Sequence, residues 1–286
     1  MKNVADSAAP HLSLVPSAGS LPEAAPPRFS VIAPMLNEAE NVEPMAREIA
    51  AACAGLEPFE IIFVNDGSTD ATGARIAALR AELPWLREVR HARPCGQSAA
   101  LRSGVLAARA PLICTIDGDG QNPPAEIPRL LQPLLEGDAA GLGAGLGAGL
   151  GAGLGPGLGA GLGLVAGQRV GRKDRRTRRL ASRVANGLRG WLLDDHTRDT
   201  GCGLKAFPRD VFLRLPYFDH VHRFLPALVR REGYEVMLVD VAHRARTAGR
   251  TKYTNLGRAM VGLVDLLGVW WLLRRRKIAS VVHEDP

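Results

Sequence analysis

Two carboxylates and a carboxamide at alternate positions are the residues with the clearest potential chemistry in this chain of 286 residues. Asp117, Asp119 and Gln121 directly follow an apolar run at residues 112–116. Oxygen ligands at this spacing suit Mg²⁺ or Mn²⁺, and such an ion would in turn hold phosphate oxygens. Taken alone, the segment could also be an ordinary polar turn rich in Asp and Gly. The surrounding elements decide between these interpretations.

The apolar run before the acids predicts a buried strand, because it is short, rich in β-branched residues and bounded by Pro111. Acids at the carboxyl end of such a strand lie where open α/β sheets bind ligands. The same pattern recurs, with strands predicted at residues 29–33, 60–64, 86–91 and 164–167 and helices at 40–54, 70–82 and 97–108. Further short elements are predicted at 211–215, 224–231 and 234–239. This alternation favours an α/β fold with a mostly parallel sheet flanked by helices.

Two other predicted strands also end in polar residues. The first strand leads into a turn that contains Pro34 and the acid Glu38. The second ends at Val64 and is followed by Asp66, which could accept hydrogen bonds from a base or a ribose. Because the carboxyl ends of parallel strands share one edge of the sheet, a single ligand crevice is predicted there.

In their order and spacing these motifs resemble the family 2 glycosyltransferases of the GT-A fold, whose sheet is Rossmann-like. Within that family the chain is similar to the polyprenyl-phosphate glycosyltransferases, the group that includes dolichyl-phosphate mannose synthase. The resemblance covers about residues 29–256. Further matching segments lie at residues 96–101, 121–124, 166–169, 199–204 and 246–253.

The resemblance implies a role for each matching position. The nucleotide site would be lined by Pro34, Leu36, Glu38, Val64, Asp66 and Asp117, with Leu36 standing where an aromatic residue is often found. The metal ion would be held by Asp117, Asp119 and Gln121. The phosphates of donor and lipid acceptor would face Arg169, Arg246 and Lys252. Catalysis would depend on Asp119, Arg246 and Lys252, with Asp199 in a supporting role.

The implied reaction is inverting, metal-dependent transfer of a sugar from a UDP- or GDP-sugar to undecaprenyl or dolichyl phosphate, for cell-envelope glycan or lipid A modification. A lipid phosphate is already ionised at neutral pH, so orientation by cations matters more than a strong base. An alternative keeps the fold and transfers the sugar to a hydroxyl group in polysaccharide synthesis. That reaction needs a true base, for which Asp199 is the candidate.

Composition narrows the choice of partner and compartment. The net charge of +7 implies an anionic partner, such as a nucleotide, a lipid phosphate, a membrane surface or nucleic acid. Nucleic acid is not expected, because only 5% of residues are aromatic and no binding motif is recognised. The four cysteines form no CxxC pair, which favours reduced thiols. Residues 1–27 have no basic start followed by an apolar core, so a disordered leader and a cytoplasmic protein are predicted.

A glycine repeat interrupts the predicted GT-A domain, which spans residues 28–254. Glycine occupies every odd position from 141 to 163. A membrane-spanning helix is disfavoured because each glycine costs about 1 kcal/mol in a helix. A dinucleotide-binding loop needs glycines at i, i+2 and i+5, which the odd spacing forbids. Residues 139–163 are therefore interpreted as a flexible surface insert.

Two basic segments favour contact with an anionic membrane. Residues 172–189 carry eight basic groups against one acid, as an amphipathic helix or simply a solvated helix face. Residues 255–286 are predicted to form an interfacial amphipathic helix and a basic tail, with Trp270 and Trp271 beside a cluster of cations. The charge-free run after Asp265 spans eight residues, whereas crossing a bilayer takes about 20. Peripheral association is predicted; a core helix with a basic last turn is the alternative.

Overall fold

The structure is a computed structural model that describes residues 25–139, 161–170, 187, 189–195, 197–244 and 255–276. For residues 138–139 and 255–260 it describes the backbone alone. Several predictions therefore lie outside the described residues. They are the leader except for residues 25–27, the glycine repeat at 140–160, most of the basic segment 172–189, the end of the basic tail, and both Arg246 and Lys252.

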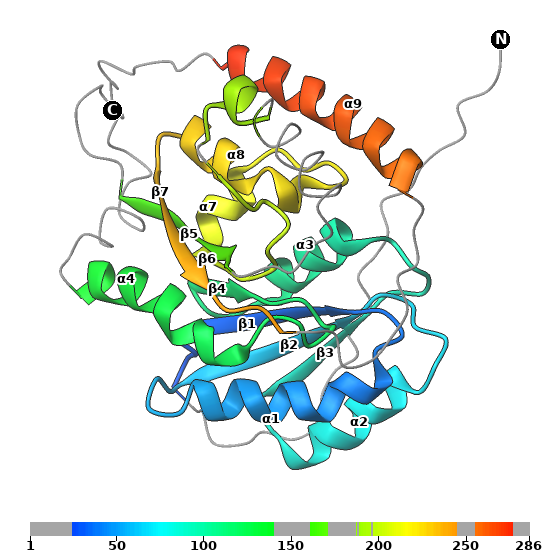
Figure 1. The fold of residues 1–286 in the computed structure, drawn as a ribbon. Helices are drawn as coiled ribbons and strands as arrows, with labels where there is room; N and C mark the ends of the chain where they lie inside the picture. The colour runs from blue at the N-terminus through cyan, green and yellow to red at the C-terminus, as the bar shows by residue number, and fades with distance from the viewer. Residues whose placement is uncertain are drawn as a thin grey trace, which may run out of the picture.

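A seven-stranded sheet forms the centre of the protein (Figure 1). Its strands are β1 (Phe29–Met35), β2 (Phe59–Asn65), β3 (Leu86–Arg90), β4 (Leu112–Thr115), β5 (Leu162–Arg169), β6 (Lys205–Pro208) and β7 (Glu235–Val241). Their order in the sheet is β3-β2-β1-β4-β6-β5-β7, and β6 runs antiparallel to both of its neighbours. The other pairings are parallel. The mostly parallel α/β sheet predicted from the strand and helix pattern is confirmed.

Helices cover both faces of the sheet (Figure 1). One face carries α1 (Val42–Ala52), α2 (Thr72–Glu82) and α4 (Ile127–Ala139), and the other carries α3 (Gln97–Ala107), α7 (Arg209–Arg214) and α8 (Leu225–Arg231). Short 3₁₀ turns occur at η1 (Ala39–Asn41), η2 (Pro124–Glu126) and η3 (Val221–Arg223). Alternate residues of a strand pack into the two hydrophobic cores on opposite faces of the sheet. In β1, Val31 packs into the core on the α1 face and Ile32 into the core on the α3 face.

The second half of the chain differs from the sequence-based prediction in three places. The element predicted at 211–215 is the helix α7, which begins at Arg209. Strand β6 was not predicted, because it has only four residues and begins with a lysine. Strand β5 begins at Leu162, so the last glycine of the repeat, Gly163, belongs to the sheet. A Cβ atom there would lie 2.4 Å from Cβ of Tyr234, which explains why no side chain fits.

The C-terminal helix α9 (Asn255–Arg274) lies outside α8 (Figure 1). Leu266 and Val269 are buried in the core that α9 shares with α8. Val264, Leu267 and Trp271 are exposed, so this part of the helix is apolar on two sides. Within the described residues no helix has the length and apolar character needed to cross a membrane. The amphipathic character expected of the whole segment stays a prediction.

Candidate active site

The carboxyl ends of three neighbouring strands place the predicted acids along one edge of the sheet. Pro34 lies near the end of β1, Asp66 directly follows β2, and Asp117 follows β4 by two residues. Asp117 and Pro34 line the same narrow pocket, together with Gln97 and Lys205. The sequence separations are large, but parallel strands bring these residues to one place.

Asp117 is oriented by neutral amides and by a glycine. Its Oδ1 accepts a hydrogen bond of 2.8 Å from Nε2 of Gln97, and its Oδ2 accepts one of 3.1 Å from Nδ2 of Asn122. A Cβ atom on Gly203 would lie 2.2 Å from the carboxyl carbon of Asp117. The carbonyl of Gly203 is in turn held by the Thr115 hydroxyl at 2.6 Å. The carboxylate therefore requires a residue without a side chain at position 203.

The electrostatics of this segment suit a cation. Burial raises the pKa of Asp117, and the negative charge of Asp119 raises it further, against the opposing effect of nearby cations. Asp119 accepts a hydrogen bond of 3.1 Å from the backbone N–H of Gln121. The buried Oδ1 of Asn122 has no hydrogen-bond partner among the described residues. Because carboxylate and amide oxygens are hard donors, and the two neighbouring carboxylates repel each other, they fit a divalent ion of the Mg²⁺ or Mn²⁺ kind.

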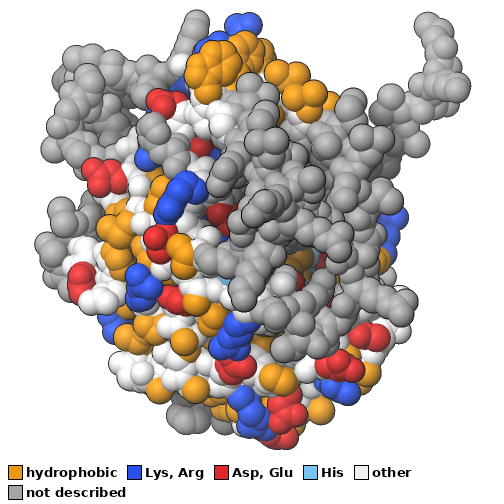
Figure 2. Space-filling view, viewed as in Figure 1, with side chains coloured by type: hydrophobic (Ala, Val, Ile, Leu, Met, Phe, Trp, Pro, Cys, Tyr) orange, Lys and Arg blue, Asp and Glu red, His pale blue; other side chains and the backbone are white. Residues whose placement is uncertain are grey.

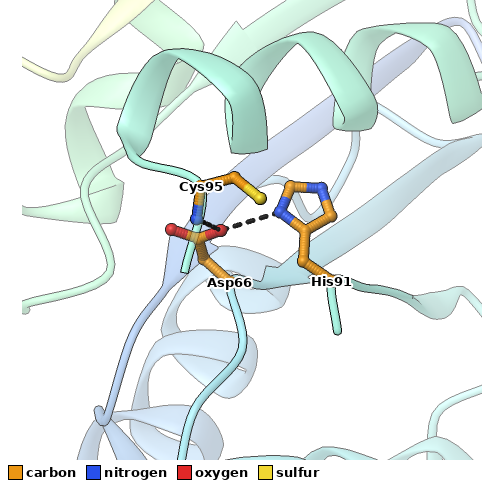
Figure 3. A group of neighbouring side chains, drawn as sticks. All are labelled: Asp66, His91 and Cys95. Atoms are coloured by element: carbon orange, nitrogen blue, oxygen red, sulfur yellow. Dashed lines mark hydrogen bonds and ion pairs between the residues drawn. The ribbon is translucent and has the colours of Figure 1, made fainter. Parts of the chain in front are cut away.

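Asp66 is held by two backbone N–H groups and a histidine from one loop (Figure 3). Its Oδ1 accepts the backbone N–H of Cys95 at 2.8 Å and lies 2.7 Å from Nδ1 of His91, while its Oδ2 accepts the N–H of Gly96 at 2.9 Å. Nε2 of His91 lies 2.9 Å from the hydroxyl of Ser103. The ligand atoms of Asp66, His91 and Cys95 are close enough to hold a metal ion, yet the hydrogen bonds already account for their arrangement. Asp66 thus fixes the loop that starts α3, the helix whose first residue is Gln97.

The other positions expected at the nucleotide site differ in how they face it. The Val64 side chain is fully buried under α3, so only its backbone can face a ligand. Glu38 is half-buried, accepts a hydrogen bond of 2.6 Å from Nδ2 of Asn41, and donates its backbone N–H to Thr72 at 2.9 Å. Leu36 is half-buried just beyond β1. The nucleotide-binding roles of these residues stay predictions.

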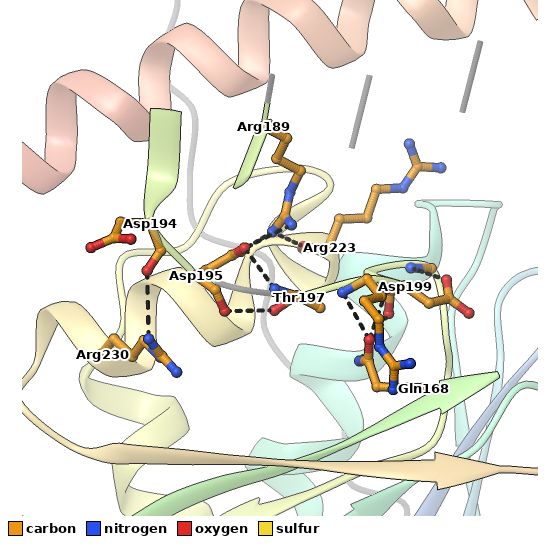
Figure 4. Close-up of polar contacts among 10 residues, drawn as sticks. Gln168, Arg189, Asp194, Asp195, Thr197, Asp199, Arg223 and Arg230 are labelled. Atoms are coloured by element: carbon orange, nitrogen blue, oxygen red, sulfur yellow. Dashed lines mark hydrogen bonds and ion pairs between the residues drawn. The ribbon is translucent and has the colours of Figure 1, made fainter. Parts of the chain in front are cut away.

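Arg169 and Asp199 form a two-pronged ion pair at the end of β5. Nε of Arg169 lies 2.5 Å from Oδ2 of Asp199, and Nη2 lies 2.9 Å from Oδ1. Burial alone would raise the pKa of Asp199, but the hydrogen bonds and charge of Arg169 outweigh it and the pKa is lowered. Oε1 of Gln168 accepts the backbone N–H groups of Arg198 and Asp199 at 2.9 and 2.8 Å (Figure 4). Asp199 therefore orients a cation and is poorly suited to accept a proton.

A second ion pair lies nearby and is buried (Figure 4). Arg189 donates from Nη1 to Asp195 at 3.1 Å, bonds the same carboxylate through Nη2, and reaches the carbonyl of Arg223 at 3.3 Å. Thr197 also donates its backbone N–H to Asp195 at 3.2 Å. Arg189 was predicted to belong to a basic helix face exposed to solvent or membrane. That prediction is wrong for this residue, because Asp195 draws it into the interior.

Two residues of the pocket were missed at the sequence level. Lys205 is buried on β6 and donates to the carbonyl of Cys202. His222 lies on η3, with its Nδ1 2.7 Å from the hydroxyl of Ser98. Burial, followed by the charge of Lys205, lowers the pKa of His222 well below its usual range, so the ring is neutral. The available signal was a lysine within an otherwise apolar run, since lysines are seldom fully buried without a reason.

Solved structures support the fold. The glucosyl-3-phosphoglycerate synthase of Mycobacterium tuberculosis, in complex with Mn²⁺, UDP-glucose and glycerol 3-phosphate, resembles this chain with a TM-score of 0.59 and 21% identity. The match covers 89% of this chain and 82% of that one. At this identity the similarity concerns the fold, and it confirms the predicted GT-A-like architecture.

Sequence comparison then places the chain in its family. Glycosyl transferase family 2 matches residues 30–152. The chain is 32% identical over 251 residues to the dodecaprenyl-phosphate galacturonate synthase of Rhizobium johnstonii, a match covering 86% of this chain and 67% of that protein. It is 30% identical over 261 residues to the undecaprenyl-phosphate 4-deoxy-4-formamido-L-arabinose transferase of Serratia proteamaculans, covering 89% and 72%. The fold and the acid motif define a glycosyltransferase. The chain belongs to glycosyl transferase family 2.

Proposed function

We propose that this glycosyltransferase transfers a sugar from a UDP- or GDP-linked donor to a polyprenyl phosphate, with inversion at the anomeric carbon. The observation that carries the proposal is the half-buried pair Asp117 and Asp119, which shares the carboxyl edge of the sheet with the oriented cation Arg169. Two relatives, from Rhizobium and Serratia, are both named for sugar transfer to a polyprenyl phosphate. Because the sugars in those two names differ, the donor screen uses several UDP- and GDP-sugars to identify the one that this chain transfers.

Asp117, Asp119 and Gln121 would hold the divalent ion. When bound, such an ion neutralises charge that develops on the diphosphate leaving group. The chain's own contribution is to keep the ligands in place. Gln97 and Asn122 hold the two oxygens of Asp117, and the N–H of Gln121 holds Asp119. This arrangement needs no reorganisation when the donor arrives.

A lipid phosphate acceptor is compatible with an Asp199 that is paired with Arg169 and does not act as a base. An ionised phosphate attacks without losing a proton, so a strong general base is not required. Asp199 is occupied by Arg169 and its pKa is lowered, which disfavours the alternative of a hydroxyl acceptor. The planar guanidinium of Arg169 matches phosphate as well as carboxylate. Arg246 and Lys252 are proposed as further phosphate-binding cations.

The exposed side of α9 would rest on the membrane. Val264, Leu267 and Trp271 are exposed there, and hydrophobic side chains gather over this helix beside basic groups (Figure 2). Arg274 lies over the ring of Trp270 at 4.2 Å, so the last turn presents aromatic rings with cations. Rings at headgroup depth and cations on anionic lipid favour an interfacial position. We propose peripheral association with the cytoplasmic face of a membrane on this basis.

The test of the reaction is a donor screen with protein reconstituted on liposomes, Mn²⁺ or Mg²⁺, polyprenyl phosphate and radiolabelled UDP- and GDP-sugars. A chloroform-extractable product that disappears with EDTA and in Asp119→Ala is expected. Asp210→Ala, which changes an exposed aspartate on α7, serves as the control and should retain activity. Donor hydrolysis without a lipid product would contradict the proposed acceptor, and silence with every donor would contradict the reaction itself.

Membrane contact is tested separately by co-sedimentation with phosphatidylglycerol vesicles. The wild-type protein is expected to sediment at low salt, and Leu267→Ser with Trp271→Ser should weaken this. Met237→Ser removes a similarly exposed apolar side chain from β7, away from α9, and should leave binding unchanged. Wild-type protein that stays in the supernatant would exclude the proposed membrane surface.

A further inference from the structure

Lys205 is an unusual residue in the interior of this protein. Its side chain is only 4% exposed, and it is the one lysine that falls within the described ranges. It lies at the start of β6, paired in register with Thr115 of β4, two positions before Asp117. The buried location is imposed by the sheet, because β6 is enclosed between β4 and β5.

The ammonium group of Lys205 has more hydrogen-bonding capacity than its surroundings use. It carries three donors, and its hydrogen bond within the described part of the chain goes to the carbonyl of Cys202. No carboxylate of the described residues lies within ion-pair distance of its Nζ. A buried charge without a direct partner costs free energy, so two unspent donors on an ammonium call for an explanation.

The pocket supplies the place where those donors can be used. Lys205 lines it together with Gln97, Asp117 and His222. His222 is neutral and engaged with Ser98, so it adds no positive charge and supplies no negative partner for the ammonium. The pocket therefore has a cation in its wall immediately beside the acid motif.

Charge balance alone is the competing explanation for Lys205. The charges of Asp117 and Asp199 do act on it at longer range. However, Asp199 is already paired with Arg169, and both oxygens of Asp117 accept amide hydrogen bonds. In the part of the chain that the structure describes, neither carboxylate accepts a hydrogen bond from the ammonium, so its other donors are available to a ligand group.

We propose that Lys205 binds an anionic oxygen of the nucleotide-sugar donor in this pocket. The oxygen comes either from a carboxylate on the sugar or from the phosphate next to the sugar. The inference rests on the proposed function and goes beyond it, because it assigns a donor-binding residue outside the motifs found in the sequence. If the oxygen belongs to a sugar carboxylate, Lys205 selects uronate donors over their neutral counterparts.

The test uses Lys205→Met, which keeps the length and removes the charge, beside Lys205→Arg, which keeps the charge. Arg214→Met, at an exposed cation on α7, is the matched control. Steady-state kinetics are measured with UDP-galacturonate and UDP-galactose, and UDP binding is measured by calorimetry. Lys205→Met is expected to raise the donor KM or the UDP Kd about 10- to 100-fold, with partial recovery in Lys205→Arg.

The pattern of loss identifies the source of the oxygen. If Lys205→Met raises KM for UDP-galacturonate but not for UDP-galactose, the oxygen belongs to a sugar carboxylate. If the KM values of both donors and the Kd of UDP rise equally, the oxygen belongs to a phosphate. Unchanged donor KM and UDP Kd in a folded Lys205→Met would overturn the proposal and leave charge balance as the role of Lys205. Should this variant fail to fold by thermal melting, Lys205→Gln replaces it under the same criteria.

The two levels of inference fail in different ways. If the wild-type protein transfers no sugar from any donor, the proposed function fails. Calorimetry on wild type and Lys205→Met with UDP and UDP-galacturonate needs no turnover, so it still decides the role of Lys205.

Discussion

The two halves of the site hold their carboxylates by different means. On the β1–β4 side, Asp66 is bound by two backbone N–H groups and His91, and Asp117 by two side-chain amides. On the β5–β6 side, Asp199 is bound by the guanidinium of Arg169. Backbone donors are fixed by their loop and cannot leave. An arginine can exchange a carboxylate for a phosphate, because both match its planar fork.

The difference teaches how rigid and adaptable functions are divided. In the proposed function the first half would bind the metal and the nucleotide, and its carboxylates are held largely by backbone N–H groups and side-chain amides, whose hydrogen bonds depend little on salt. The second half pairs Arg169 with Asp199, and in the proposed function this cation would turn to an anionic substrate. A second pair of the same cation–carboxylate kind, Arg189 with Asp195, is buried deeper in the protein.

The largest effect is expected from breaking the acid motif on the rigid side. Asp119→Ala should lower sugar transfer about 10²- to 10³-fold, because it removes a proposed ligand of the ion that would neutralise the leaving group. Thermal stability should change little, since Asp119 is half-buried and its hydrogen bond to the N–H of Gln121 is local. The measurement is transfer rate against Mn²⁺ concentration. Retention of wild-type activity and metal dependence would exclude Asp119 from the metal site.

A glycine substitution tests how rigid the first half is. In Gly203→Ala the new Cβ would lie 2.2 Å from the carboxyl carbon of Asp117, so the carboxylate must move. A displacement of about 1 Å can cost about 10²-fold in rate, and a loss of that order in kcat is expected. Gly137→Ala, where a Cβ meets nothing within 4 Å, is the control. Full activity in Gly203→Ala would show that the acid tolerates displacement.

Removing the Asp66 carboxylate should weaken both the stability of the loop at residues 91–96 and the binding of UDP. Asp66→Ala leaves the N–H groups of Cys95 and Gly96 without their acceptor, which should cost about 1–3 kcal/mol of unfolding free energy. UDP binding should weaken in parallel, because α3 begins from this loop. Urea denaturation and calorimetry measure the two effects. Raising the salt concentration should not reproduce them, in contrast to a charge-held loop.

The smallest effects concern pH, and the two halves should respond with opposite sign. The lowered pKa of Asp199 contributes stability that is complete above the ordinary Asp pKa of about 3.9 and is lost as pH falls through the lower folded value. The raised pKa of Asp117 instead costs stability once pH rises above that same ordinary value, and the cost is complete above the raised folded value. At pH 7 in EDTA, Asp199→Asn should therefore lower Tm and Asp117→Asn should raise it. Shifts of the same sign in thermal melts would contradict the contrast.

The regular elements were predictable because their signals are local. β1, β2 and β4 are apolar runs followed by polar turns, and their positions in the structure agree with the patterns at residues 29–33, 60–64 and 112–116. β6 was missed because four residues beginning with Lys205 carry no alternation. The short element predicted at 211–215 was given no type, because the six residues of α7 are too few to distinguish a helix from a strand.

The sequence by itself determined the class of fold and the order of the motifs, because apolar periodicity and the polar residues at strand ends are properties of neighbours along the chain. Only the tertiary structure decided the partners of those residues. Arg169 meets Asp199 across 30 positions, and Thr115 holds Gly203 across 88, thereby pressing that glycine against Asp117. Such pairs form only when the fold brings distant segments together, and the pKa of each acid then depends on both its burial and its partners. No local pattern could have shown that Asp66 is held by neutral N–H groups and Asp199 by a cation.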